Sequence, residues 1–480
     1  MSYHLWNRFI LLFTYIFVLV GFTGYTQDWS GYNTDNFAGV NRMQINPASI
    51  ATTPYKVDVN IIGADLIGFN ANLFTNFKIA NEVNEVGEGS FFRTLDDGET
   101  DYLVSGQVLL PSAIVSLDSV SALGFSMRVR SKTNLETGDN RISELLRNDF
   151  DVPELIGEVF SNVSVDGTVD NWIEYNFTYA RQLLHKNNHK LRVGITPKLI
   201  TAVGSGYVRL SNLSFGLQDQ DTLVNVSGSL EFGYSNDLQQ TFDGEFDLFQ
   251  NTAFGINIGV EYEFGDPREY SKKNPWDFHP GYRFRIGVAY IDQGTLKFDK
   301  TEDSFDYSVN VDEFSLDSFR ELETVEELAD TLNNLFTERE TDPTFKVKLP
   351  ATLAFQIDYH IKGPFYVNFS PFIGLRGGER KLFEVRNPSS YALTFRYEKR
   401  RFGAALPLYT NSLSGTQVGL YLRWGPLVLG STNAFSGLFS GNSNRINLYT
   451  AIKLSFWKPE YRRRTVRASM NTSTPNQSDY

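Results

Sequence analysis

The residue types that most often carry catalysis or hold metal ions are sparse in this sequence and poorly arranged for either task. It contains no Cys, which excludes disulfides, thiolate metal sites and a cysteine nucleophile. His185 and His189 could share a metal ion, but they fall in the short polar stretch "HKNNHK", which is typical of a solvated turn. No Ser lies in a Gly-x-Ser-x-Gly motif. We therefore expect no catalytic residues, no metal site and no cofactor, and hence a protein that is not an enzyme.

Charged residues of both signs recur in a pattern that could do chemistry, because they alternate with apolar residues. In the stretch 253–264, "AFGINIGVEYEF", the large apolar residues fall on one face of an extended chain, whereas Asn257, Glu261 and Glu263 fall on the other. Other segments repeat this arrangement. The candidate ligand-binding or lumen-lining residues are Arg128, Arg130, Glu174, Lys198, Glu261, Glu263, Arg285, Asp358, Arg396 and Arg423.

These ten side chains allow two interpretations. They could line a polar conduit or a binding pocket, or they could form ion pairs that fill and stiffen the interior of the protein. An unpaired buried charge is costly, so the balance of positive and negative residues favours mutual pairing.

Period-two alternation runs through most of the chain, so the predicted fold class is all-β. The composition agrees, with 39 Phe, 24 Tyr and 38 Gly. A soluble β-sandwich also alternates, but here the apolar faces are rich in aromatic residues at their ends, and the opposite faces mix Gly with charges. These features favour a transmembrane antiparallel β-barrel over a secreted all-β protein.

The alternating segments predict about fourteen strands, an even number that leaves both chain ends in the periplasm. The predicted strands are 55–74, 105–117, 120–132, 170–183, 191–202, 252–264, 282–298, 347–361, 365–376, 389–399, 402–409, 416–424, 427–433 and 446–457. Short links alternate with long polar excursions, as expected for periplasmic turns and outer loops. The excursion 203–251 contains strand-like sequence, which reads as an extension above the membrane or as two further wall strands, giving sixteen.

Two outer excursions, 141–162 and 318–336, have apolar residues at helical spacing. They could be helices that cap the barrel mouth or docking faces for a partner. The second lies in the stretch 299–342, which has 15 Asp or Glu, 3 Lys or Arg, and a net charge of −12. That composition is typical of a solvated, self-repelling loop. Its carboxylates could also bind divalent cations, although their spacing matches no calcium loop.

The two chain ends have distinct compositions. Arg8 precedes the apolar run "FILLFTYIFVLV", which predicts a cleavable signal peptide over 1–26, with cleavage near Thr26. The apolar run is short for a membrane-spanning helix, the alternative interpretation. Residues 458–480 form a basic tail with a Ser/Thr/Asn/Pro-rich end, which predicts a disordered periplasmic segment. A signal peptide followed by a predicted transmembrane barrel predicts a protein of the outer membrane of a Gram-negative bacterium.

Several phrases resemble the FadL-like outer-membrane barrels, including the PorV and PorP groups associated with type IX secretion. They include the turn "NPA" formed by Asn46, Pro47 and Ala48, "LRVGITPKLITAVGSGYV" (191–208) and "FRIGVAYIDQGTLKF" (284–298). The resemblance covers most of the chain after residue 26. It implies that residues 27–54 fold into the barrel of residues 55–457 as a luminal hatch, with the NPA turn at the wall. Alternatively, the turn ends a flexible N-terminal tail.

The resemblance leaves two functions open. The first is a passive channel for small hydrophobic molecules, with an apolar pocket above the hatch and a lateral gap at a strand kink, for which Pro197 and Pro371 are candidates. The second is a non-conducting scaffold or partner subunit in an outer-membrane secretion or assembly complex. The expected partners are outer-membrane lipid, a hydrophobic ligand and other proteins, but no nucleic acid.

Overall fold

The computed structural model describes most of the chain beyond the predicted signal peptide. The described residues are 29–70, 73–74, 93–94, 100–148, 150–236, 238, 251–265, 281–302, 304–317, 325–339, 342–376, 383–411, 415–439 and 445–458. The predicted signal peptide and all of the predicted tail except Lys458 therefore lie outside them. No helix among the described residues is long and apolar enough to cross a membrane.

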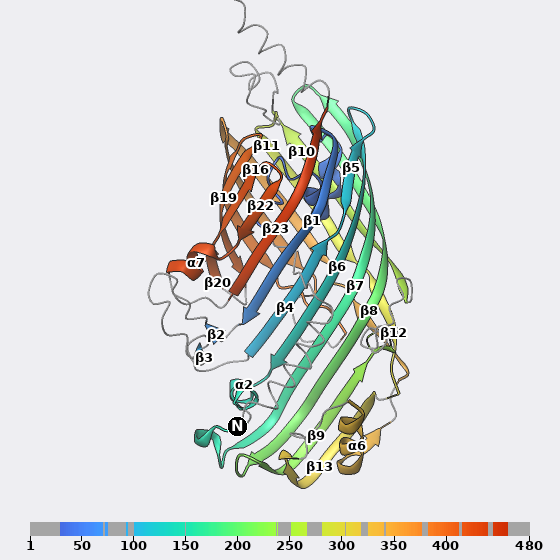
Figure 1. The fold of residues 1–480 in the computed structure, drawn as a ribbon, viewed down its shortest axis with the longest axis vertical. Helices are drawn as coiled ribbons and strands as arrows, with labels where there is room; N and C mark the ends of the chain where they lie inside the picture. Colours follow the sequence, from blue (N-terminus) through green and yellow to red (C-terminus); the bar gives the residue numbers. More distant parts are fainter. Residues whose placement is uncertain are drawn as a thin grey trace, which may run out of the picture.

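Antiparallel strands close into a barrel, because β1 (Tyr55–Asn70) pairs with β23 (Arg445–Trp457) at the two ends of the wall (Figure 1). The intervening wall strands are β4 (Thr100–Leu109) with β5 (Ser112–Ser116), β6 (Ser121–Thr137), β7 (Val159–Lys186), β8 (His189–Leu217), β10 (Thr252–Phe264), β11 (Phe284–Gln293), β16 (Thr352–Lys362), β17 (Phe365–Gly374), β18 (Ser390–Glu398), β19 (Phe402–Asn411), β20 (Gly415–Val418) with β21 (Leu420–Trp424), and β22 (Leu427–Ser431). With β4/β5 and β20/β21 each taken as one interrupted strand, the described wall has 14 strands, as predicted.

Side chains alternate between the two faces of this wall in the sense that a membrane barrel requires. On β10, Ile258 and Val260 are exposed on the outside, whereas Asn257, Glu261 and Glu263 are buried on the inside. A soluble sandwich would show the reverse. Exposed aromatic residues mark one rim of the outer face; they are Phe264, Phe284, Phe365, Phe402, Trp424 and Phe456. The secreted β-sandwich alternative is therefore wrong.

The barrel has a short-turn end, at the top of Figure 1, and a long-loop end, at the bottom. The turn between β7 and β8 is Asn187–Asn188, and the turns Gly363–Pro364 and Gly425–Pro426 are equally short. Asn187, Gly363 and Gly425 have φ values of 53°, 57° and 58°, a left-handed conformation that Asn and Gly adopt most easily. The predicted short links therefore lie at one end of the barrel.

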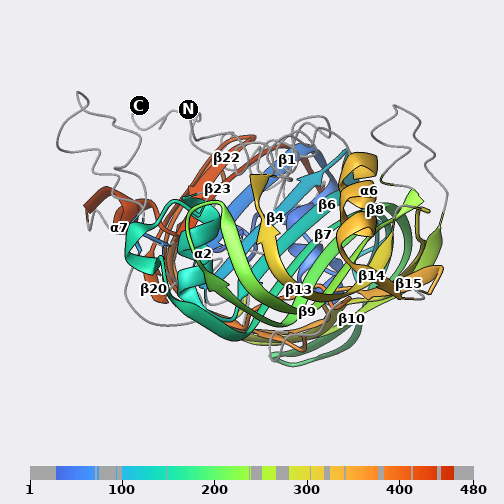
Figure 2. The same cartoon turned by 90° about the horizontal axis from the view of Figure 1, so that it is seen from below.

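The strands β6, β7 and β8 continue past the rest of the wall at the long-loop end. There β8 pairs with β9 (Thr222–Tyr234), and β9 pairs with β13 (Phe305–Ser315), so these strands form a sheet that projects from the barrel (Figures 1 and 2). The described part of the 203–251 segment thus extends the wall and adds no fifteenth or sixteenth wall strand. β13 also carries β14 (Thr337–Arg339), and neither strand was expected within the acidic stretch 299–342.

The predicted helices are only partly correct. In 141–162, α2 (Asn140–Arg147) forms, followed by the short turn η3 (Pro153–Leu155), but Val159 and Phe160 belong to β7. Gly157 lies between η3 and β7 and has a φ of 87°, a conformation that stops a helix from continuing. In 318–336 the described helix is α6 (Val325–Leu335). A short helix, α7 (Ala434–Phe439), follows β22, and the small pair β2 (Leu73–Phe74) and β3 (Arg93–Thr94) follows β1.

A small sheet lies against the inner wall at the long-loop end. It pairs β12 (Thr295–Asp299) with β15 (Thr344–Lys348), and the main chain at Phe383 and Val385 bonds to Lys348. Its apolar side chains pack on Trp172 and Ile200, which face the lumen. This inner sheet narrows the barrel from the long-loop side.

The wall strands are interrupted at Leu110–Pro111, between β4 and β5, and at Gly419, between β20 and β21. The predicted kinks at Pro197 and Pro371 are wrong. Pro197 keeps its register with Ile256 inside a continuous β8, and Pro371 does the same with Tyr391 inside β17. On its other neighbour, β7 or β16, each Pro lies in a short gap of the ladder, but the register is the same on both sides of that gap.

Candidate functional site

Residues 29–54, called the plug segment here, fill the lumen at the short-turn end of the barrel (blue in Figure 1). None of these residues is exposed. The segment folds into two short 3₁₀ turns, η1 (Gly39–Gln44) and η2 (Pro47–Ile50). Up to Thr53 its backbone hydrogen bonds to other backbone groups stay within the segment, so side chains attach it to the wall.

The NPA turn rests on glycines of the inner wall. Asn46 caps η2, since its Oδ1 accepts from the Ala48 N–H at 3.0 Å while its Nδ2 donates to the Val260 carbonyl at 3.1 Å. Gly194 of β8 and Gly259 of β10 face each other across the ladder beneath the turn. A Cβ on Gly194 would collide with the main chain at Pro47 and Ala48, and one on Gly259 with Asn46. The absence of side chains at these glycines makes room for the turn.

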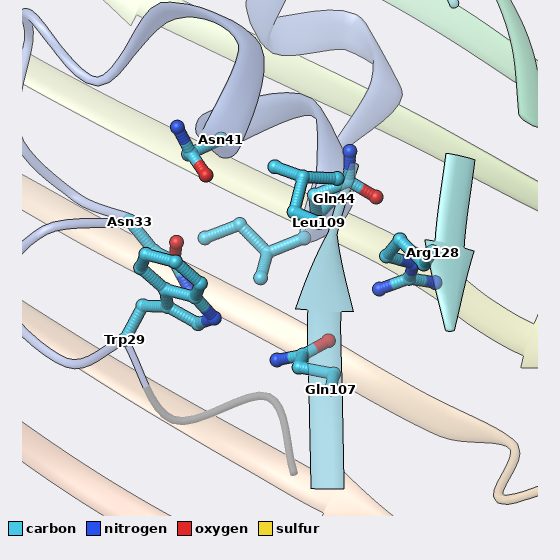
Figure 3. Close-up of a pocket in the computed structure, with 8 residues that line it drawn as sticks. Trp29, Asn33, Asn41, Gln44, Gln107, Leu109 and Arg128 are labelled. Atoms are coloured by element: carbon cyan, nitrogen blue, oxygen red, sulfur yellow. The ribbon is translucent and has the colours of Figure 1, made fainter. Parts of the chain in front are cut away.

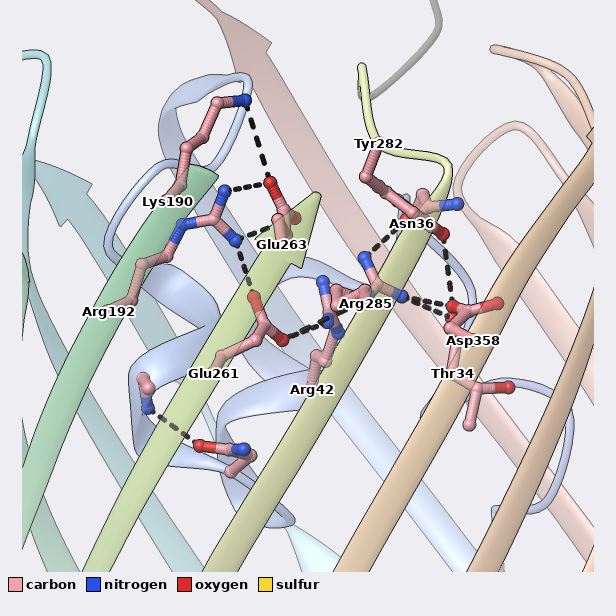
Figure 4. A network of polar contacts seen from close by, with 12 residues as sticks. Thr34, Asn36, Arg42, Lys190, Arg192, Glu261, Glu263, Tyr282, Arg285 and Asp358 are labelled. Carbon is pink, nitrogen blue, oxygen red and sulfur yellow. Dashed lines mark hydrogen bonds and ion pairs between the residues drawn. The ribbon is translucent and has the colours of Figure 1, made fainter. Parts of the chain in front are cut away.

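A first group of ion pairs joins the plug segment to β8 and β10 (Figure 4). Glu261 binds Arg42 of the plug segment and Arg192 of β8. Glu263 accepts from Arg192 at 2.7 Å and lies 3.6 Å from Lys190. One carboxylate therefore connects a plug guanidinium with a wall guanidinium.

A second group joins the plug segment to β11, β16 and β18. Asp358 binds Arg285, accepts from Arg396 at 2.6 Å, and accepts from the Tyr282 hydroxyl at 3.0 Å. The side-chain oxygen of Asn36, in the plug segment, accepts from Arg285 at 2.7 Å (Figure 4). All of these polar side chains are buried.

A third group holds the plug segment on the opposite side. Asp35 accepts from Arg423 at 3.0 Å and from the Tyr421 hydroxyl at 2.6 Å. Asp58 of β1 accepts from the Val40 N–H at 2.9 Å and from Lys453 at 3.2 Å. The segment is thus anchored around much of the barrel's circumference.

A separate charged cluster lies on the inner wall over β6, β7, β8 and β11, and none of its five charges belongs to the plug segment. Glu174 and Asp292 are its two acids, and Arg128, Arg130 and Lys198 are its three bases. Arg128 lies 2.5 Å from Glu174, Arg130 lies 2.8 Å from Asp292, and Lys198 lies 2.5 Å from Asp292. These five charges form one buried layer.

The structure places all ten candidate residues on the inner face, where they are buried, and distributes them over these groups. The charged partners that the sequence analysis missed include Asp35, Arg42, Arg192 and Asp292. Arg192 has the same strand parity as Lys198, so its position was readable from the pattern. Across the described residues, twelve Lys or Arg and eleven Asp or Glu side chains are buried, which matches the mutual-pairing interpretation.

A small cavity lies between the plug segment and the wall (Figure 3). Its volume is about 10 Å³, enough for about one water molecule. It is lined by Trp29, Asn33, Asn41, Gln44, Ile45, Gln107, Leu109 and Arg128. The cavity reaches the wall at Leu109, the residue before the Leu110–Pro111 interruption. The Asn60 side chain donates to the Leu109 carbonyl there, at 3.2 Å.

The fold and the site define a closed antiparallel β-barrel with an apolar outer face and a lumen filled by an N-terminal segment. Within the described residues, no group of three or more His, Asp or Glu is arranged to hold a metal ion. The profile described as "Family of unknown function (DUF5723)" matches residues 47–432, and the chain belongs to this family.

Solved structures of similar outline include the toluene transporter TbuX of Ralstonia pickettii, at 10% identity and a TM-score of 0.42, with 87% of this chain and 94% of that chain covered. The toluene transporter TodX of P. putida has 10% identity and a TM-score of 0.44, with 88% and 95% covered. The CymD monoaromatic hydrocarbon channel has 13% identity and a TM-score of 0.40, with 92% and 99% covered. These scores assign no function to this chain. No curated protein matches the sequence.

Proposed function

We propose that this protein is an outer-membrane channel for small apolar molecules, which the plug segment holds closed. The alternation of exposed apolar and buried polar side chains along the wall fits a bilayer outside and a polar lumen inside. The aromatic rim at the short-turn end fits the interface between the hydrocarbon and the headgroups.

The attachment of the plug segment carries this proposal. The barrel wall closes through its own backbone ladder between β1 and β23, whereas the plug segment is held up to Thr53 by side-chain contacts. Moving the segment therefore breaks ion pairs and hydrogen bonds but no strand pairing. In water these polar groups would be solvated, so the cost of displacement is partly offset.

The wall interruption at Leu110–Pro111 supplies an exit for an apolar molecule. Leu109 of β4 pairs with Arg128 of β6, and Ala113 of β5 pairs with Phe125 of β6. The register to β6 therefore shifts by one residue across the interruption. The small cavity lies directly inside, at Leu109. We place the lateral gap here, where a molecule in the lumen could pass into the bilayer beside Arg128 of the charged cluster.

Entry of N-phenyl-1-naphthylamine into Gram-negative cells tests the proposal, because an intact lipopolysaccharide layer slows this apolar dye. Expression of the protein should raise the initial rate of fluorescence increase several-fold over cells with an empty vector. A matched variant with Pro111→Val should show a lower rate at equal expression. An unchanged rate with the folded protein in the outer membrane would exclude the channel for this class of molecule.

The charged cluster favours a second candidate, a non-conducting scaffold in an outer-membrane complex. Its five charges pair without any plug residue, so part of the lumen stays filled if the plug segment leaves. A scaffold would keep the lumen closed after deletion of residues 29–54, whereas a channel would open.

A further inference from the structure

The short-turn end of the barrel carries an excess of basic side chains. Nine of them are exposed or half-buried, whereas Asp118 is the one exposed acid at this end among the described residues. The nine are Lys56, Arg181, Lys186, Lys190, Arg283, Lys362, Lys399, Arg400 and Arg401. They are spread over β1, β7, β8, the residue before β11, β16 and the turn between β18 and β19, so they form a belt around the rim. In the sequence, segment 265–280 adds no net charge, and segment 459–480 adds +2.

Three of these bases are held against aromatic rings. The guanidinium of Arg283 lies 4.6 Å from the centre of the Tyr359 ring, and that of Arg400 lies 4.1 Å from Trp457. The ammonium of Lys399 lies 5.5 Å from the centre of the Tyr397 ring. Such contacts orient a cation without neutralising its charge.

The belt begins where the apolar outer band ends. Phe284, 43% exposed, follows Arg283, and Phe402, 42% exposed, follows Arg401. Phenylalanine side chains face the hydrocarbon, so the neighbouring cations lie at the depth of the lipid headgroups.

The long-loop end has the opposite charge. Its exposed acids include Glu154, Asp312, Glu313, Glu327 and Asp330. The positive potential is therefore confined to one end of the molecule, which gives the two rims different preferences for charged lipids.

From these observations we propose that the basic–aromatic belt of the short-turn rim binds anionic glycerophospholipid headgroups of the leaflet at that end. The inference goes beyond the channel proposal and is independent of it, because it requires insertion in a membrane but no transport. A phosphate group fits the belt because a cation fixed on a ring can donate hydrogen bonds to its oxygens.

Quenching of tryptophan fluorescence by brominated lipids tests the belt directly. Trp424 is 79% exposed on the outer face near the short-turn end, whereas Trp29 and Trp172 are buried in the lumen. The full-length protein is reconstituted with brominated phosphatidylglycerol or brominated phosphatidylcholine in competition with the unbrominated lipid. At low salt we expect about fivefold preference for phosphatidylglycerol, from one or more basic contacts per lipid. The preference should fall toward one at high salt.

Two charge-matched triple variants give the comparison. The belt variant carries Arg283→Gln, Lys399→Gln and Arg400→Gln and should lose most of the preference. The control carries Lys297→Gln, Arg339→Gln and Lys346→Gln, three exposed cations of the long-loop end, and should keep it. Heat-modifiable migration on gels verifies the fold of each variant. If the belt variant does not fold, the salt dependence of the lipid preference of the native protein decides whether the proposal holds. Equal quenching by both lipids in the native protein, or equal loss in both variants, would overturn the proposal.

Discussion

At the scale of single residues, the position of the plug segment depends on the absence of side chains at two wall glycines as well as on the charged side chains that bind it. Gly194 and Gly259 leave the space that Pro47 and Asn46 occupy. Around this contact, buried charges hold the segment in pairs, which limits the cost of placing ions inside a closed barrel.

Replacing Gly194 with Ala should loosen the plug segment. The added Cβ collides with backbone atoms of the NPA turn, which cannot rotate away, so the turn must move. We expect a higher ion leak in planar bilayers and faster protease cleavage within residues 29–54. Gly68→Ala is the control, because no atom lies within 4 Å of its new Cβ. Equal effects of both substitutions would show that the contact does not hold the plug.

The Asp35–Arg423 pair should behave as a buried pair. Asp35→Asn or Arg423→Gln alone leaves an uncompensated buried partner and should lower the free energy of unfolding by about 3–5 kcal/mol. The double variant should lose less than the sum of the two, as measured by chemical denaturation in detergent.

A surface pair provides the matched comparison. Lys348 lies 2.8 Å from Glu384, and its side chain is 52% exposed. Lys348→Gln should therefore lower the free energy of unfolding by less than about 1 kcal/mol.

For the buried pair, additive effects of the substitutions at Asp35 and Arg423 on the free energy of unfolding would contradict the coupling inferred from their contact.

At the scale of elements, the interruption between β4 and β5 differs from the two prolines within continuous strands. Of these three positions, Leu110–Pro111 is the one at which the register to a neighbouring strand changes and at which the small cavity meets the wall. Proline by itself was therefore a poor guide, since Pro197 and Pro371 stay in register with their neighbours.

Pro111→Val should reduce dye entry at least twofold if molecules leave through this interruption, because Val supplies the missing N–H donor and favours a regular strand. Pro197→Val makes the same chemical change in an uninterrupted strand and should leave the rate unchanged. Initial rates in cells with equal amounts of folded protein give the comparison. If both variants transport at the native rate, the exit lies elsewhere.

The wall strands could be predicted because each alternates large apolar and small or charged residues over many positions. β13 was missed because its acidic residues, such as Asp312 and Glu313, resemble a solvated loop when the pairing with β9 is unknown. The plug partners Asp35 and Arg42 follow no periodic pattern, since they lie in irregular turns. Their roles depend on contacts with residues hundreds of positions away, such as Arg423 and Glu261.

At the scale of the whole molecule, charge is sorted by location. The interior is close to balanced, the long-loop end is acidic, and the short-turn rim is basic. The described interior therefore contributes almost nothing to the formal net charge of −12. A balanced interior suits a lumen that is closed at rest and that needs a movement of the plug segment to open.

Single-channel conductance of the native protein and of a variant lacking residues 29–54 tests that central claim most directly. The native protein should show no steady conductance. The variant should conduct, because its deletion removes the groups paired with Glu261, Arg285 and Arg423 and admits water to the lumen. A folded variant that stays closed would contradict the channel, and the charged cluster would then be the seal of a scaffold.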